Sequence, residues 1–137
     1  MTTKVIQDLW ILSDGGIVLF SRVFNPKVNE QLFGALMTAL NTFATELTSG
    51  GLTSFELSSI RFTIMKNNKY MFVCNSAKKV KEKHVIDELR RISESFLDLH
   101  SDDLDNWDGD LGLFTGFEEH IEDSLEETIK KFQKAFW

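Results

Sequence analysis

The stretch LWILSDGGIVLF, residues 9–20, admits two interpretations of how the fold begins. Its paired glycines follow an apolar run, so they could cradle a phosphate or simply reverse the chain. A phosphate loop needs glycines that lead into a helix, with Lys-Ser or Lys-Thr following. Here Gly15-Gly16 leads into a second run rich in β-branched and aromatic residues, which is typical of a strand. Residues 13–16 are therefore predicted to form the turn of a hairpin that joins strands at 5–12 and 17–24.

A long helix is predicted after this hairpin. Asn25 suits the N-cap and Pro26 the first turn, and Gly50-Gly51 suits the end. Apolar residues between these signals recur every three or four positions, which indicates one amphipathic helix. Phe33 and Met37 widen a stripe that consists of Val28, Leu32, Leu36, Leu40, Phe43 and Leu47.

The middle of the chain predicts further strands. Apolar residues alternate with polar ones from Ile60 to Ile64, as in a half-buried strand. Ser58-Ser59 either divides residues 53–66 into two strands or forms a bulge in one long strand. The polar residues 66–69 predict a turn, and the apolar run 70–74 predicts a central strand that is covered on both faces.

The last part of the chain predicts two more helices, at 78–99 and 114–137, with an acidic loop at 101–113 between them. The apolar stripe of the first comprises Val80, His84, Val85, Leu89, Ile92, Phe96 and Leu99, and that of the second comprises Phe117, Ile121, Leu125, Ile129, Phe132 and Phe136. The predicted order is β-β-α-β-β-β-α-α. We expect an α+β fold in which helices pack on a five-stranded antiparallel sheet, in one domain that spans residues 1–137.

Composition limits the class of protein. The net charge of −6 argues against a nucleic-acid partner, because such proteins normally present a basic face. Cys74 is the one cysteine in the sequence, so no intramolecular disulfide is possible and a reducing compartment is expected. No apolar run approaches the ~20 residues of a membrane span, and the N-terminus lacks a signal-peptide core. We expect a cytoplasmic protein whose membrane contact, if it has any, is peripheral.

No motif predicts catalysis, a metal or a cofactor. With Gly109 at the sixth position of an EF-hand loop, Leu104 and Thr115 occupy the two positions that need acidic anchors. The loop is instead expected to be solvated, with Trp107 folded back to anchor it. The three histidines, at positions 84, 100 and 120, form no ligand pair of the usual spacing, and no GxSxG elbow is present. Cys74 is expected to be a buried, unreactive thiol.

Two groups of residues are candidates for an interface. Lys78, Lys79, Lys81 and Lys83 form a basic patch at the predicted start of a helix, where the macrodipole disfavours cations. The patch is either a solvated helix start or a contact for an acidic partner or an anionic lipid surface. Phe136 and Trp137 end the chain beside several lysines, which makes them candidates for an intermolecular contact.

The organisation of the chain resembles the longin domain, within the longin/roadblock superfamily of profilin-like folds. The resemblance is carried by the hairpin VIQDLWILSDGGIVLFSRVF, the long helix NPKVNEQLFGALMTALNTFATEL, the strands FELSSIRFTIMKNNKYMFVCN, and the helix DELRRISESFLDLH with a closing helix after it. Roadblock proteins proper usually begin with a helix, and this chain begins with a strand, which favours longin.

The resemblance implies a non-enzymatic module for protein–protein interaction. Such domains act as scaffolds or regulators in vesicle trafficking and small Ras-like GTPase signalling, and they often pair into homodimers or heterodimers through a sheet edge or a helix. The alternative is a small-molecule sensor of the PAS type. PAS domains usually place several short helices between their second and third strands, and they would hold an apolar cavity beneath the sheet.

Overall fold

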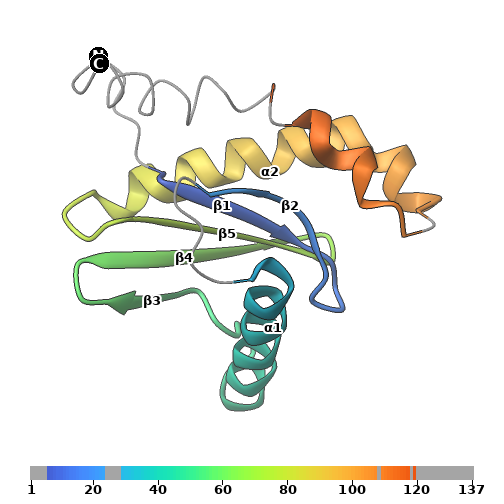
Figure 1. Cartoon of the computed structure of the whole chain (residues 1–137). Coiled ribbons are helices and arrows are strands. Elements are labelled where there is room, and N and C mark those ends of the chain that lie inside the picture. Colours follow the sequence, from blue (N-terminus) through green and yellow to red (C-terminus); the bar gives the residue numbers. More distant parts are fainter. Residues whose placement is uncertain (1–5, 24–28, 108, 118, 120–137) are drawn as a thin grey trace.

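The computed structural model describes residues 6–23, 29–107, 109–117 and 119 of the 137-residue chain (Figure 1). Through α2 the elements follow the predicted order, as β1 (Asp8–Leu12), β2 (Val18–Arg22), α1 (Glu30–Leu47), β3 (Ser54–Leu57), β4 (Ile60–Asn67), β5 (Tyr70–Ala77) and α2 (Glu82–Asp105). A short 3-10 helix, η1 (Leu111–Phe117), comes after α2. The α+β class and the five-stranded antiparallel sheet are confirmed. Most of the predicted last helix, 114–137, lies outside the described residues.

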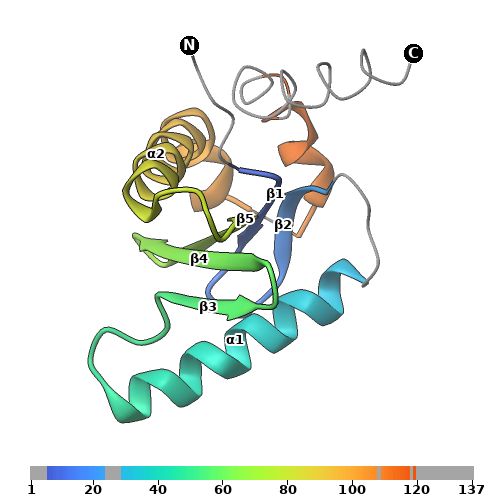
Figure 2. The same ribbon diagram turned by 90° about the vertical axis from the view of Figure 1, so that its left-hand side faces the viewer.

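The sheet has the strand order β2-β1-β5-β4-β3, so β5 is central, as its apolar run predicts. Helix α2 covers one face of the sheet and α1 crosses the other (Figures 1 and 2). Side chains of β5 are buried on both faces from Tyr70 to Ser76. The molecule is therefore a three-layer arrangement with one hydrophobic cluster on each side of the sheet.

The period of two along each strand divides the side chains between these clusters. In β1, Leu9 and Ile11 belong to the cluster under α2, whereas Trp10 belongs to the cluster under α1. In β5, Phe72 and Cys74 pack on the α2 side, and Met71 and Val73 pack on the α1 side. A strand with two covered faces must be apolar at nearly every position, because neither face meets water.

The turn at residues 13–16 is a hairpin turn, as predicted. The amide of Ser13 donates to the carbonyl of Ile17 at 2.8 Å, and the amide of Gly16 donates to the carbonyl of Ser13 at 3.0 Å. Gly16 has a φ of 91°, which favours glycine. A Cβ atom placed on Gly34 of α1 would lie 2.3 Å from the Gly16 carbonyl oxygen. These two glycines let the hairpin and α1 approach each other closely.

Helix α1 begins later than predicted. The side-chain oxygen of Asn29 accepts hydrogen bonds from the amides of Gln31 at 3.0 Å and Leu32 at 3.1 Å. Asn29 is thus the N-cap of the described helix, whereas the predicted cap, Asn25 with Pro26, lies outside the described residues. Both asparagines have the chemistry of a cap, and the sequence signal does not rank them.

Ser58 and Ser59 divide the first two strands of the predicted trio, so the hairpin alternative is the right one and the bulge is not. Leu57 pairs with Ile60 across this turn, and Ser58 has a φ of 46°. At the other end of β4, the strand ends at Asn67 and β5 begins at Tyr70. The predicted turn therefore shortens to its last two residues, 68 and 69.

Both predicted bounds of α2 are wrong. Lys78 and Lys79 lie in the connection between β5 and α2, because the Arg61 guanidinium holds the carbonyls of Lys78 at 3.3 Å and Val80 at 3.1 Å. At its C-terminal end, α2 continues to Asp105 through the first five residues of the predicted loop. The buried ring of His100 replaces the predicted Leu99, which is 45% exposed, on the inner face.

The segment after α2 is held by Trp107, as predicted. The indole N–H of Trp107 donates to the carbonyl of Asp110 at 3.0 Å, and its ring lies 6.1 Å from that of Phe114. Phe114 and Phe117 of η1 are fully buried against α2. Within the described residues, no helix combines the length and the apolar character needed to cross a membrane.

Candidate protein-interaction surface

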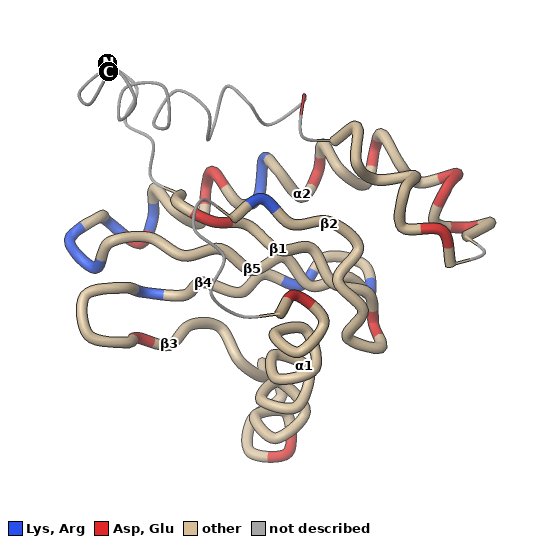
Figure 3. Tube along the Cα trace, in the orientation of Figure 1, with Lys and Arg blue, Asp and Glu red and all other residues tan. Residues whose placement is uncertain are grey.

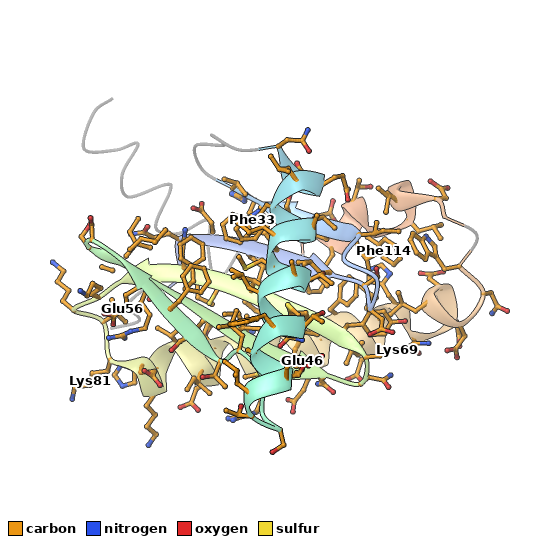
Figure 4. All side chains as sticks on the ribbon, turned by 90° about the horizontal axis from the view of Figure 1, so that it is seen from below. Phe33, Glu46, Glu56, Lys69, Lys81 and Phe114 are labelled. Carbon is orange, nitrogen blue, oxygen red and sulfur yellow. The ribbon has the colours of Figure 1, made fainter. Side chains whose placement is uncertain are left out.

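Helix α1 rests on the sheet along a narrow inner side. Gly34 and Met37 are buried, and the ring of Phe33 stacks on that of Trp10 with a centroid distance of 4.3 Å. Figure 4 views this side of the molecule, with α1 lying across the strands. The aromatic contacts continue into the sheet, where the Phe62 ring lies 6.0 Å from Trp10 and 4.7 Å from Phe55.

Two polar side chains fix the position of α1. The Gln31 amide pairs with the backbone of Val18 in edge strand β2, accepting from its N–H at 3.1 Å and donating to its carbonyl at 3.3 Å. Asn41 accepts a hydrogen bond from the amide of Leu52 at 3.2 Å, in the segment that follows the helix. The helix is thus anchored near both ends by residues on its inner side and flanks.

The apolar stripe that the sequence predicts for α1 points away from the sheet. We call this stripe the α1 outer face, and its exposed fractions are 64% for Leu32, 52% for Leu36, 37% for Leu40, 65% for Phe43 and 70% for Leu47. The spacing of apolar residues predicts one stripe that also contains Phe33 and Met37. That grouping is wrong, because the structure places Phe33 and Met37 on the side that contacts the sheet.

The α1 outer face is large and uncharged. Glu30 and Glu46 are the charged residues of α1, and the fifteen positions from Gln31 to Thr45 carry none. The exposed parts of the five apolar side chains amount to roughly 500 Å², whereas monomers rarely expose contiguous apolar patches above a few hundred Å². A standard interface buries about 800 Å² per partner, so this face alone would supply more than half of one. It has the properties of a surface that another macromolecule covers.

Strand β3 gives this side of the molecule an open sheet edge. It pairs with β4 and ends the strand order, and within the described part of the chain no strand pairs with its outer side. Figures 1 and 2 place β3 next to α1. An unpaired strand edge can accept a strand from a partner, because its backbone donors and acceptors still lack protein partners.

The four lysines of the predicted basic patch lie together at one end of the sheet, and all four are exposed. The Lys78 ammonium lies 3.3 Å from the Glu56 carboxylate, which also contacts Arg61 at 3.2 Å. Hydrogen bonds from Arg61 and Lys78 hold the pKa of Glu56 below its ordinary value. The other two predicted contact residues, Phe136 and Trp137, lie outside the described residues.

The cysteine and the described histidines occupy separate places. Cys74 is fully buried in β5, and burial raises the pKa of its thiol well above the ordinary value. His84 is exposed at the start of α2, whereas His100 is buried among the rings of Phe96, Phe114 and Phe117. The His100 Nδ1 lies 3.0 Å from the Asp103 carboxylate of the same helix, and the ring contacts with Phe114 and Phe117 join α2 to η1. In the described ranges, no three His, Cys, Asp or Glu side chains gather as a metal site requires.

No protein-family model and no curated protein matches the sequence. Solved structures do match. A roadblock/LC7 domain from Streptomyces avermitilis aligns with a TM-score of 0.55 at 15% identity, over 66% of this chain and 82% of that chain. Myxococcus xanthus MglB aligns with a TM-score of 0.51 at 13% identity, over 66% and 85% of the two chains.

A chain of the mammalian SRP receptor aligns over 98% of this chain and 100% of its own length, with a TM-score of 0.51 and 14% identity. At such identities the likeness concerns the fold. The chain has the longin/roadblock fold, which confirms the resemblance inferred from the order of elements.

Proposed function

We propose that this chain is a non-enzymatic protein–protein interaction module that works as a scaffold or regulator in small Ras-like GTPase signalling or vesicle trafficking. The observation that carries the proposal is the α1 outer face, an uncharged apolar stripe on the solvent side of a helix that is already fixed to its sheet. Burying this stripe would be favourable for any partner with a matching apolar surface.

The first partner we propose is a second copy of the chain, paired through α1 and the β3 edge. Each copy carries a net charge of −6, so two copies repel each other over most orientations. The α1 outer face carries no charge between Gln31 and Thr45, and two such faces can therefore meet without opposing like charges. A face that is complementary to itself is what a two-fold symmetric dimer requires. A related chain with a similar helix would give a heterodimer on the same grounds.

The GTPase part of the proposal is supported by the fold. The resemblance to longin/roadblock domains implies a role with small Ras-like GTPases, and the chain has the fold on which this resemblance rests. The sequence contains one cysteine and can form no disulfide within the chain, and on this basis we propose a cytoplasmic location. A sensor of the PAS type is less well supported, because one long helix, α1, connects β2 to β3 and another long helix follows β5.

Two measurements test the proposal. Light scattering at micromolar concentration should report about twice the 15.7 kDa of one chain. Pull-down with a panel of purified small Ras-like GTPases, loaded with GDP or with a GTP analogue, should retain at least one of them in one nucleotide state. The matched control is the double variant Leu36→Glu/Phe43→Glu, which changes the α1 outer face alone. A mass of one chain at 100 µM would contradict the dimer, and retention of no GTPase in either state would contradict the GTPase role.

A further inference from the structure

Two chain connections form a basic surface at one end of the sheet. They are the β3–β4 turn, residues 57–60, and the β5–α2 connection, residues 78–81, and both project from the same end of the molecule (Figure 1). The amide of Lys78 donates to the carbonyl of Ser59 at 3.0 Å, which ties the two connections together. We call this surface, together with Lys83 in the first turn of α2, the lysine tip.

The lysine tip is held in shape by Arg61. Its guanidinium donates to the carbonyls of Lys78 and Val80 and contacts the Glu56 carboxylate, so the connection before α2 is fixed to β4. Lys78 is engaged with Glu56. Within the part of the chain that the structure describes, Lys79, Lys81 and Lys83 form no ion pair, and Glu82 is the one acidic residue in the run 78–83.

Charge is segregated along α2, with the lysine tip at its N-terminal end and an acidic group at the other (Figure 3). The acidic group consists of Asp98, Asp102, Asp103, Asp105 and Asp110, and the last turn of α2 has no basic residue. A helix of 24 residues separates these ends by roughly 36 Å. Cations at an N-terminus and anions at a C-terminus both oppose the macrodipole, so this arrangement costs some stability, although Glu82 in the first turn is favourable.

The lysine tip also presents an apolar side chain. Leu57 is 57% exposed at the end of β3, directly before Ser58 with its positive φ. Its strand neighbour Ile60 pairs with Ala77, which directly precedes the lysine run. Two strand spacings of about 4.8 Å therefore separate the Leu57 backbone from that of β5. Basic residues and an exposed leucine at one end of the sheet combine the two interactions that hold a protein on an anionic membrane surface.

We propose that the lysine tip docks on an anionic lipid bilayer, with Lys79, Lys81 and Lys83 at the headgroups and Leu57 at the acyl boundary. A planar negative surface attracts the basic end and repels the acidic end of α2, which sets the orientation of the molecule. We favour lipid over an acidic protein because the tip is built from projecting connections and has an exposed apolar side chain at the same end of the sheet as its charges.

The contact is weak and reversible. Each lysine near an anionic surface strengthens binding roughly fivefold, so three unpaired lysines and one leucine give half-saturation on the order of 1 mM accessible lipid. The lysine tip is separate from the α1 outer face, which lies over the opposite face of the sheet from α2 (Figure 2), and it shares only Leu57 with the β3 edge proposed for the dimer. A module bound to a protein through α1 could therefore rest on a membrane at the same time.

The first test is co-sedimentation of the full chain with vesicles of phosphatidylcholine alone or with about 30% phosphatidylserine. Binding should require phosphatidylserine and should weaken as NaCl is raised from about 50 to 300 mM. The double variant Lys79→Ala/Lys81→Ala should lose roughly 25-fold in affinity. The matched control is Lys69→Ala/Arg90→Ala, which removes the same charge from exposed positions outside the tip; Figure 4 shows Lys69 at the opposite end of the sheet from Lys81. The control should change affinity less than about twofold.

The second test reports whether the tip itself touches lipid. Cys74 is fully buried, so the variant Leu57→Cys can be labelled selectively with a dye whose emission shifts to the blue in an apolar environment. The matched control is Leu99→Cys, on α2 and 45% exposed. Phosphatidylserine vesicles should shift the emission of the dye at position 57 and leave that at position 99 unchanged.

Several outcomes would overturn the assignment. They are absence of binding by the wild-type chain at 50 mM NaCl, equal losses in the two double variants, or equal dye responses at positions 57 and 99. Tighter binding to polyglutamate than to the phosphatidylserine vesicles would assign the lysine tip to an acidic protein and would equally refute the lipid proposal. The dimer and the GTPase contact are measured in assays that contain no lipid. A negative result in those assays is therefore distinguishable from a failure of the lysine tip to bind vesicles.

Discussion

The substitution Phe43→Asp should abolish association through α1 and leave the fold intact. Phe43 is 65% exposed and belongs to the uncharged α1 outer face, so its ring contributes little to the hydrophobic core. About 130 Å² of its surface is available to a partner, and burial of that area would contribute roughly 3 kcal/mol. Its loss corresponds to about 100-fold in the dissociation constant, before the cost of burying a carboxylate is added. In a symmetric dimer the change occurs twice, so the combined effect approaches 10⁴-fold by the same reckoning.

Sedimentation velocity from about 1 to 100 µM measures the association, and urea unfolding at the lowest concentration measures stability. The free energy of unfolding of Phe43→Asp should lie within about 0.5 kcal/mol of the wild type. The matched control is Phe33→Ala on the inner side of the same helix. Its ring stacks on Trp10 at 4.3 Å, so its removal should cost roughly 2–4 kcal/mol of stability. Unfolding of Phe43→Asp to the same degree as Phe33→Ala, or unchanged self-association, would refute the assignment of the two faces.

Three other predictions concern close packing, the cysteine and the carboxylate of the lysine tip. Gly34→Ala should destabilise the fold by about 1–3 kcal/mol in urea unfolding, because its Cβ would lie 2.3 Å from the backbone oxygen of Gly16 in the hairpin turn. The control Gly15→Ala should cost less than about 0.5 kcal/mol, because no atom lies within 4 Å of the added Cβ. Burial raises the pKa of Cys74, so iodoacetamide at pH 8 should modify it only when the chain unfolds, and modification of the native protein at the rate of a small thiol would contradict this. Glu56 has a lowered pKa in the folded state, so its ionised form adds stability above its ordinary pKa of 4.5, and this is lost as the pH falls through the folded value. The midpoint temperature of Glu56→Gln should therefore lie below that of the wild type at pH 7 and approach it at about pH 3; a difference that grew on acidification would have the wrong sign.

Much of the fold could be predicted because its signals are local. The turn at residues 13–16, the division at Ser58-Ser59 and the apolar run of β5 are each encoded within a few residues. The predicted helix boundaries differ from the structure where two nearby residues have the same capping chemistry, or where a residue distant in the sequence decides the start of a helix. Asn25 and Asn29 can both cap a helix, and a single arginine from β4 delays the start of α2.

The two surfaces could be predicted to different degrees. The lysines stand out as a local run of like charge, and the sequence alone identifies them. The sequence does not indicate that Leu57 belongs to this surface, because Leu57 lies twenty-one positions before Lys78. The pairing of β4 with β3 and with β5 brings the two residues to the same end of the sheet. For the α1 outer face a signal did exist, since α1 has apolar residues on both sides and no charge over fifteen positions. A helix that meets water on one side normally carries charged residues there.

The strands, α1, α2 and their order follow from local sequence signals, because turn chemistry and the periods of two and 3.6 residues act over short distances. Which side of α1 meets the sheet depends on contacts between segments that are distant in the sequence. Periodicity cannot choose between two apolar sides, and the choice depends on fit: Gly34 permits close approach to the hairpin turn, and Phe33 finds the ring of Trp10. The larger leucines and Phe43 are left in solvent by that fit, which is why the surface we assign to a partner exists at all.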